Sequence, residues 1–158
     1  MRVKTTRFAE IEVSDDKMLR FPEGLIGFES CTRFALISRG DSLFMWLQSL
    51  DDPALAFVVT DPSAFVPGYK PEIDRDSLRT LGVESPSDLK YLSIAVVPAD
   101  PSRTTINLRA PIAVNHGNRV AVQVVTLNPD NPLKFRVFDR GGARGDSACP
   151  DSGEGTSC

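Results

Sequence analysis

The sequence predicts an all-β, mainly antiparallel fold, either a small pseudobarrel or a two-sheet sandwich with one or two short helices. Three observations support this fold class. Alternation of apolar and polar residues with a period of two dominates the chain, the alternating segments are short, and Gly, Pro, Asp or Ser bounds each of them. Many short strands joined by turns are typical of barrels and sandwiches.

The expected strands follow the alternation along the chain. The first six are expected at residues 3–8, 10–13, 34–37, 43–50, 54–59 and 91–97. The clearest pattern runs from 105 to 115, where every second residue is apolar, and it predicts one half-buried strand bent at Pro111. A turn from Asn115 to Asn118 and the alternating valines of 120–124 then predict an antiparallel hairpin.

One helix is predicted between residues 74 and 82. Either Asp74 or Asp76 can cap its N-terminus, Leu78 and Leu81 share one face, and Gly82 is a typical stop. A second helical turn is expected after Asp61, because Pro62 suits the first helical position.

The length of 158 residues fits one domain, and we expect a single β domain over 1–140. Residues 141–158 contain five glycines and no Val, Ile, Leu or Phe. A segment of this composition buries too little apolar surface to offset its ordering entropy. We therefore expect a disordered Gly-rich tail from 141 to 158.

Composition argues against several classes of protein. The net charge of -3 gives no electrostatic reason to bind nucleic acid directly. No apolar run approaches the roughly 20 residues of a membrane helix, so we expect no membrane contact and a cytoplasmic location. The three cysteines match no zinc spacing and are expected to be reduced thiols: Cys31, Cys149 and Cys158.

No pattern of catalytic residues is found. His116 is the only histidine, it falls in the predicted hairpin turn, and no nucleophile, phosphate-loop or zinc-protease motif is present. We expect no catalytic residues, no cofactor and no metal site. We therefore expect that the protein is not an enzyme. A small β-barrel enzyme or ligand-binding protein acting on a small molecule stays open as an alternative, with Asp51, Asp61 or His116 as acid or base. A single-strand binder that stacks bases on Phe44, Trp46 and Tyr91 is a further alternative.

Charge is unevenly distributed along the chain. Residues 51–76 hold six acidic residues against two basic ones, whereas residues 101–140 hold six basic residues against two acidic ones. Opposed patches either orient a protein partner or neutralise each other within the fold. Phe65 and Tyr69 lie inside the acidic region, where they could anchor a partner or pack a loop onto the core.

Two segments rich in large apolar residues complete the pattern. The turn-rich block 21–29 is expected to hold the barrel together through Phe21, Leu25 and Phe28. The segment 43–50 carries large residues on both strand faces around Trp46, the only tryptophan. Either protein covers both faces or one face meets a partner, since aromatic residues and methionine are enriched in interface cores.

Four segments occur together in the order and spacing of one family: Phe21 to Glu29, Phe44 to Ser49, Ala56 to Pro62 and Asn107 to Ile112. From the first strand to Phe138 the chain resembles the bacterial flagellar assembly factor FliW family. It departs from the family at Ile26, where the family often has proline, and in the Gly-rich tail.

The resemblance implies a small β-rich pseudobarrel that binds newly made flagellin and the translational regulator CsrA. It implies that flagellin and CsrA compete, so that export of flagellin frees the factor to antagonise CsrA and relieve repression of flagellin translation. From the residues themselves, the acidic region could either dock beside the basic RNA-binding surface of CsrA or repel RNA from it. The predicted partner-binding residues are Asp51, Asp52, Asp61, Phe65, Tyr69 and Glu72.

Overall fold

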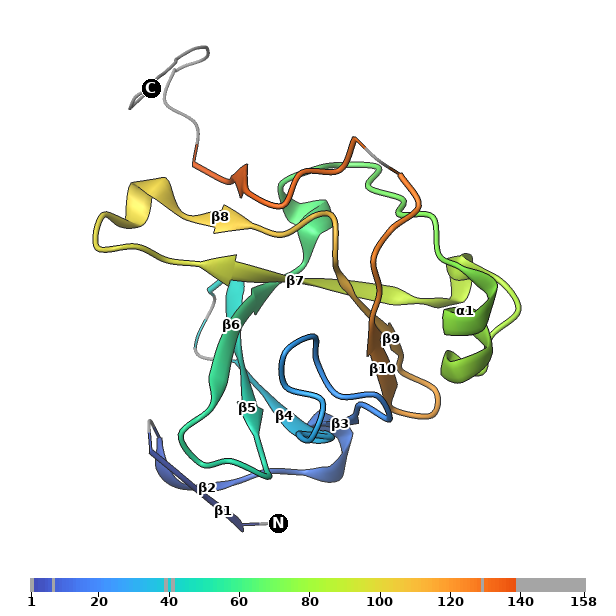
Figure 1. The fold of residues 1–158 in the computed structure, drawn as a ribbon. Helices are drawn as coiled ribbons and strands as arrows, with labels where there is room; N and C mark the ends of the chain where they lie inside the picture. The colour runs from blue at the N-terminus through green and yellow to red at the C-terminus, as the bar shows by residue number, and fades with distance from the viewer. Residues whose placement is uncertain (1, 7, 39, 41, 129, 139–158) are drawn as a thin grey trace.

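The computed structural model describes residues 2–6, 8–38, 40, 42–128 and 130–138 (Figure 1). The expected tail at 141–158, with Cys149 and Cys158, lies outside these residues, and its disorder stays a prediction. No helix in the described ranges is both long and apolar enough to cross a membrane.

Seven strands close into a barrel-like sheet. Their order is β7-β6-β5-β4-β3-β10-β9, and a further pairing between β7 and β9 closes the ring. All these pairings are antiparallel except the short contact of β10 with β3. This confirms the predicted all-β, mainly antiparallel fold, and of the two predicted architectures the structure has the pseudobarrel. The strands are β3 (Met18–Arg20), β4 (Arg33–Ser38), β5 (Phe44–Ser49), β6 (Ala56–Thr60), β7 (Lys90–Val96), β9 (Ile112–Asn115) and β10 (Val120–Gln123).

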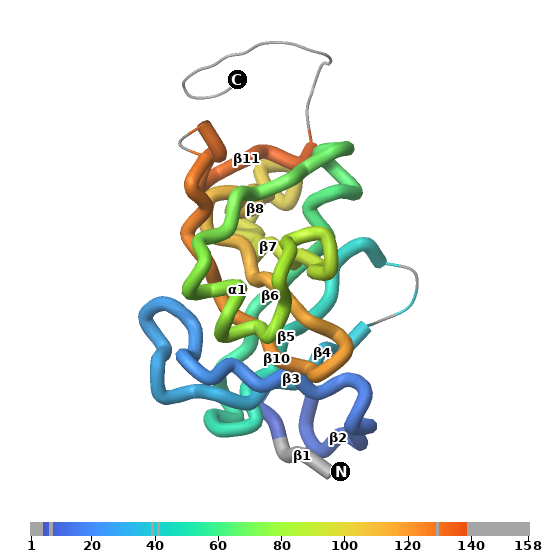
Figure 2. The backbone as a smooth tube through the Cα atoms, turned by 90° about the vertical axis from the view of Figure 1, so that its right-hand side faces the viewer, coloured from blue at the N-terminus to red at the C-terminus, as the bar shows by residue number. Residues whose placement is uncertain are grey.

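Two small additions lie at opposite ends of the barrel (Figures 1 and 2). β8 (Thr105–Ile106) pairs with the end of β7, and β11 (Phe135–Arg136) pairs with β8. At the other end, β1 (Arg2–Thr5) and β2 (Ala9–Glu12) form a separate hairpin.

The predicted continuous strand over 105–115 is wrong. It is divided into β8 and β9, because the side chain of Asn107 accepts hydrogen bonds from the N–H groups of Arg109 and Ala110. Such a local turn withdraws these residues from any ladder. The strands β3 and β11 were not predicted, because they are too short to show an alternation of apolar and polar residues.

The predicted helix is confirmed as α1 (Arg75–Leu81). The Asp74 carboxylate accepts a hydrogen bond from Ser77 N–H at 3.0 Å, and Gly82 ends the helix with a positive φ of 80°. The second predicted turn is the 3-10 helix η2 (Pro62–Ala64), capped by Asp61. Three other single turns are η1 (Asp15–Lys17), η3 (Pro86–Asp88) and η4 (Pro101–Arg103).

The barrel interior is filled by side chains that alternate along the strands, among them Phe34, Leu47 and Val59. Phe21 and Leu25 are buried with them, as predicted. Phe28 differs, because it is 40% exposed and packs against Phe57 in a T-shaped ring pair, at a centroid separation of 5.4 Å. The bridge between Leu25 and Phe28 closes a tight turn at the surface, which leaves the Phe28 ring at the rim of the core.

Candidate partner-binding surface

The six predicted partner-binding residues fall into two groups at opposite ends of β6. Asp51 and Asp52 lie in the turn between β5 and β6, whereas the other four lie on the segment 61–73, which crosses from β6 to α1 (Figure 1). The five residues of β6 separate the groups by roughly 16 Å of extended chain. The acidic region of the sequence is therefore not one surface.

Asp51 is held by the protein itself. Its Oδ2 accepts hydrogen bonds from the N–H groups of Thr32 and Arg33, at 2.9 and 3.1 Å, and its Oδ1 lies 3.1 Å from the Arg33 guanidinium. Partial burial alone would raise the pKa of Asp51, but these donors outweigh burial and lower it. Asp51 thus ties the start of β4 to the turn.

The rest of this turn is equally well bonded. The Oδ1 of Asp52 accepts from Ala54 N–H at 3.0 Å, and the hydroxyl of Ser49 accepts from the N–H groups of Asp51 and Asp52. Below them the fully buried side chain of Gln48 donates from Nε2 to three carbonyl oxygens in residues 49–55. The prediction that Asp51 and Asp52 form a turn is confirmed.

The segment 61–73 is attached differently, through its aromatic side chains. Tyr69 donates its hydroxyl to the carbonyl of Leu108 at 2.5 Å, and burial and the neighbouring Tyr91 raise the pKa of Tyr69. The Phe65 ring lies 5.8 Å from Phe44, between ring centroids. Both predicted anchors therefore pack this segment onto the barrel.

The acidic residues of the same segment face solvent. Asp61 is exposed, although its Oδ1 accepts from the N–H and hydroxyl of Ser63 at 2.9 and 2.7 Å. Glu72 binds the neighbouring loop through its backbone only, donating N–H to Asn128 Oδ1 at 2.7 Å and accepting from Leu127 N–H at 3.0 Å. Its exposed carboxylate forms no hydrogen bond or ion pair within the described part of the chain.

An apolar groove, which the sequence-based site did not include, lies beside the Phe65 ring. It has a volume of about 420 Å³ and holds no acidic, basic or cysteine side chain. Its clearest sequence signal is the run of large residues on both faces of 43–50. The groove is lined by Ser42, Phe44, Met45, Trp46, Val58, Val97, Pro101, Thr104 and Phe138.

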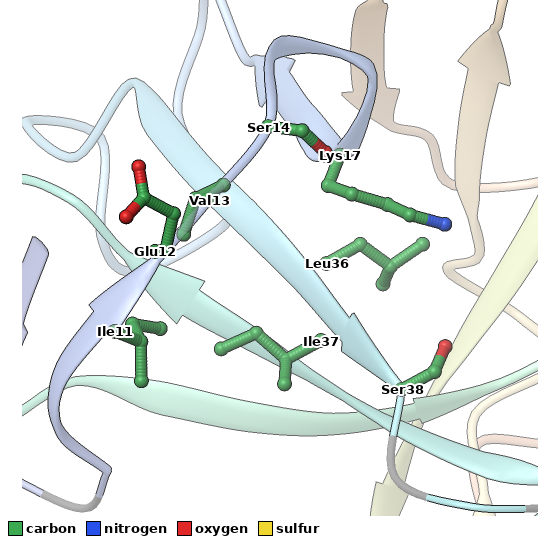
Figure 3. A pocket seen from close by; sticks show the side chains of 8 residues that line it. All are labelled: Ile11, Glu12, Val13, Ser14, Lys17, Leu36, Ile37 and Ser38. Carbon is green, nitrogen blue, oxygen red and sulfur yellow. The ribbon is translucent and has the colours of Figure 1, made fainter. Parts of the chain in front are cut away.

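A second pocket of about 480 Å³ lies between β2 and β4 (Figure 3). Its apolar floor includes Leu36 and Ile37, and Glu12 and Lys17 reach it from the β2 side. This pocket has a mixed lining, unlike the apolar groove.

The described residues contain no cluster of three or more His, Cys, Asp or Glu that could hold a metal ion. His116 is exposed in the turn between β9 and β10, as predicted. Of the three proposed stacking aromatics, Tyr91 packs with the cluster under α1, away from the groove that Phe44 and Trp46 line.

Comparison with known proteins gives one consistent family. The family model described as FliW protein matches residues 2–137. A flagellar assembly factor FliW of Syntrophus aciditrophicus is 38% identical over 139 residues, covering 87% of this chain and 88% of that protein. A second flagellar assembly factor FliW, of Ruminiclostridium cellulolyticum, is 36% identical over 141 residues, which cover 88% of this chain and 95% of that protein. A crystal structure of the flagellar assembly factor FliW superposes with a TM-score of 0.79 at 31% identity, over 87% of this chain and 97% of that one.

Proposed function

The chain belongs to the FliW family of flagellar assembly factors, and we propose that it acts by binding two proteins in turn, newly made flagellin and the translational regulator CsrA. While flagellin is abundant in the cytoplasm it occupies the factor. When flagellin is exported, the free factor binds CsrA and relieves repression of flagellin translation. Mass action between two complexes is sufficient for this switch, and no catalytic step is needed.

The observation that carries the CsrA contact is the exposed pair of carboxylates on the segment 61–73. Asp61 and Glu72 face solvent on a segment that Phe65 and Tyr69 fix to the barrel. A partner therefore meets acidic groups on an ordered backbone, which lowers the entropic cost of binding. CsrA grips RNA with a basic surface, so an acidic segment is complementary to it.

Asp51 and Asp52 have a structural role in this proposal. Their carboxylates already accept hydrogen bonds from backbone N–H groups of the turn and of β4. Removing either acid would disturb the turn as well as any contact with a partner, so neither is a clean test of binding.

A binding assay with both proteins tests the exchange. The purified chain is titrated with CsrA and with flagellin by calorimetry, and each preformed complex is challenged with the other protein on a size-exclusion column. We expect a one-to-one complex with each and displacement of one by the other. Binding to neither protein would refute the proposed function.

A change of charge tests the acidic segment. Asp61 caps η2 through Ser63 N–H, so it is replaced by asparagine, which keeps that acceptor. We expect the double variant Asp61→Asn/Glu72→Lys to bind CsrA at least tenfold more weakly at low salt, and the difference to shrink as salt screens the charges. The matched control changes the charge of two exposed acids elsewhere by the same amount, Glu10→Lys/Glu23→Gln. Equal loss in both double variants would show that only net charge matters and would remove the segment from the proposal.

A further inference from the structure

The segment 124–128, which follows β10, alternates between buried and exposed side chains. Val124 is 2% and Thr126 is 8% exposed, whereas Val125 is 56% and Leu127 is 59% exposed. In an extended chain every second side chain points to the same side, so Val125 and Leu127 share the outward side. Such positions are usually polar, and two neighbouring large apolar side chains there indicate a surface that meets another protein.

Hydrogen bonds on both edges hold this segment in place. On one edge the N–H groups of Val124 and Thr126 donate to carbonyls within residues 109–111, at 2.9 and 2.8 Å. On the other edge the N–H of Leu127 donates to the carbonyl of Glu72 at 3.0 Å. The exposed side chains therefore stand on an ordered backbone, which lowers the entropic cost of burying them against a partner.

The carboxylate of Glu72 lies on the same outward side. The residues that flank it, Pro71 and Ile73, are both buried, and Ile73 packs in the same cluster as Val124. Because alternate residues of an extended chain point to opposite sides, the Glu72 side chain points outward, as that of Leu127 does. The hydrogen bond between their backbones makes the carboxylate and the Leu127 side chain neighbours.

The loop 21–29 extends this surface. The N–H of Ile26 donates to the side-chain Oε1 of Gln123 at 2.9 Å, and Ile26 is 56% exposed. Gln123 comes two residues before Val125 and lies on the same side of the strand. Figures 1 and 2 show the loop (blue) and the segment 124–128 (orange) on one side of the barrel. We call the three exposed apolar residues the outward row: Ile26, Val125 and Leu127.

The backbone of Val125 is open to a partner as well. Because the N–H groups on either side of it point towards residues 109–111, its own N–H and carbonyl point to the opposite edge. Neither group has a hydrogen-bond partner within the described part of the chain. A protein that covers the outward row can therefore also pair with this backbone.

The position of Glu72 indicates which protein covers the row. In the proposed function the Glu72 carboxylate meets the basic surface of CsrA. A protein that contacts this carboxylate also reaches Leu127, because the two residues are joined by a hydrogen bond. Interfaces generally have an apolar core and a polar rim, and the row and the carboxylate are arranged in this way.

We propose that the outward row is the apolar core of the CsrA interface, with Glu72 at its rim. The inference rests on the proposed function and extends it, because it divides the affinity into two parts. Burial of the row supplies a part that salt does not screen, and the carboxylate supplies a part that salt does screen. CsrA accordingly presents an apolar patch beside its basic residues.

Salt separates the two parts. The variant Val125→Ala/Leu127→Ala is titrated with CsrA by calorimetry at low salt and at about 1 M salt, where the screening length falls to about 3 Å. We expect this variant to bind CsrA at least tenfold more weakly than the wild type under both conditions. Glu72→Ala should lose affinity at low salt only.

A pair of exposed valines elsewhere provides the matched control, Val96→Ala/Val97→Ala. These residues are 61% and 50% exposed, and they lie at the end of β7 that is far from α1 (Figure 1). We expect this control to keep its affinity for CsrA within twofold of the wild type. Urea unfolding checks that both variants are as stable as the wild type, since exposed side chains contribute little to the fold.

The results distinguish this inference from the function on which it rests. A wild type that does not bind CsrA would refute both. If the wild type binds CsrA and Glu72→Ala weakens the complex, but Val125→Ala/Leu127→Ala does not, only the inference fails. Loss of flagellin binding alone in that variant would assign the row to flagellin, and a dimer that the variant abolishes would assign it to a second copy of this chain. Either result overturns the proposal.

Discussion

The chain is attached to the barrel by different interactions at the two ends of β6. An Asp-Pro pair follows the strand on one side, Asp61-Pro62, and precedes it on the other, Asp52-Pro53. In the turn between β5 and β6, the carboxylates, the Ser49 hydroxyl and the Gln48 amide all form hydrogen bonds with backbone groups. In the segment 61–73, aromatic side chains attach the chain to the barrel, and Asp61 and Glu72 are exposed. Asp61 still caps η2, whereas Glu72 is held through its backbone alone, so its carboxylate is available to a partner.

The largest loss of stability is expected from Gln48→Met, at the hydrogen-bonded end. Gln48 is fully buried, and its Nε2 lies 3.0, 3.2 and 3.1 Å from the carbonyl oxygens of Ser49, Pro53 and Leu55. Methionine keeps the volume but removes the Nε2 donor, so the Ser49 carbonyl loses its side-chain hydrogen bond. The Pro53 and Leu55 carbonyls still accept from backbone N–H groups, each at 2.9 Å. The substitution should cost about 2 kcal/mol of unfolding free energy. Urea unfolding measures this loss.

Asp52→Asn is the control for this turn. Its side-chain oxygen still accepts from Ala54 N–H, so the change should stay within about 0.5 kcal/mol. A loss below about 1 kcal/mol for Gln48→Met would mean that the turn does not depend on its buried amide.

A smaller loss is expected from Tyr69→Phe, at the aromatic end. The ring and its packing remain, and only the hydroxyl that donates to Leu108 O is removed. The unpaired carbonyl should cost about 1 to 2 kcal/mol in thermal or urea unfolding. If hydrogen exchange in residues 61–73 is unchanged in this variant, Tyr69 does not hold the segment.

Asp51→Asn is expected to change the pH dependence of stability more than its magnitude. The donors around Asp51 lower its pKa in the folded protein below the ordinary aspartate value of about 3.9. Its contribution, about 1 kcal/mol, is therefore complete above that value and is lost as pH falls through the folded pKa. Unfolding curves from pH 7 to pH 2.5 should show the wild type losing its advantage over the variant as the solution becomes acidic. A constant difference over this range would contradict the role assigned to Asp51.

Sequence reasoning predicted the local features better than their arrangement. Helix α1 with its caps, the turn at Asp51 and the hairpin around His116 follow from side chains that act within a few residues. The division between β8 and β9 depends on one side chain, Asn107, which bonds to its own backbone instead of continuing the strand. Alternation alone cannot detect that choice.

The candidate site shows more clearly that sequence reasoning does not predict which residues the fold brings together. Asp52 and Asp61 belong to one acidic region of the sequence, but they lie beyond opposite ends of β6. The groove could not be predicted as a unit, because Phe44, Val97 and Phe138 come from three distant segments. Only the large residues on both faces around Trp46 indicated that an outer face of the barrel is apolar.

The smallest effect on stability is expected from Glu72→Ala, and it gives the sharpest test of the contrast between the two ends. Glu72 is attached through its backbone, to Asn128 and Leu127, so loss of its carboxylate should change unfolding free energy by less than about 0.5 kcal/mol. Affinity for CsrA should nevertheless fall about threefold to tenfold at low salt, because an exposed charge acts mainly on the partner. Calorimetry and urea unfolding of the same preparation compare the two quantities, with Glu10→Ala as the matched control. A loss of stability without a loss of affinity would place Glu72 with Asp51, among the acids that hold the fold.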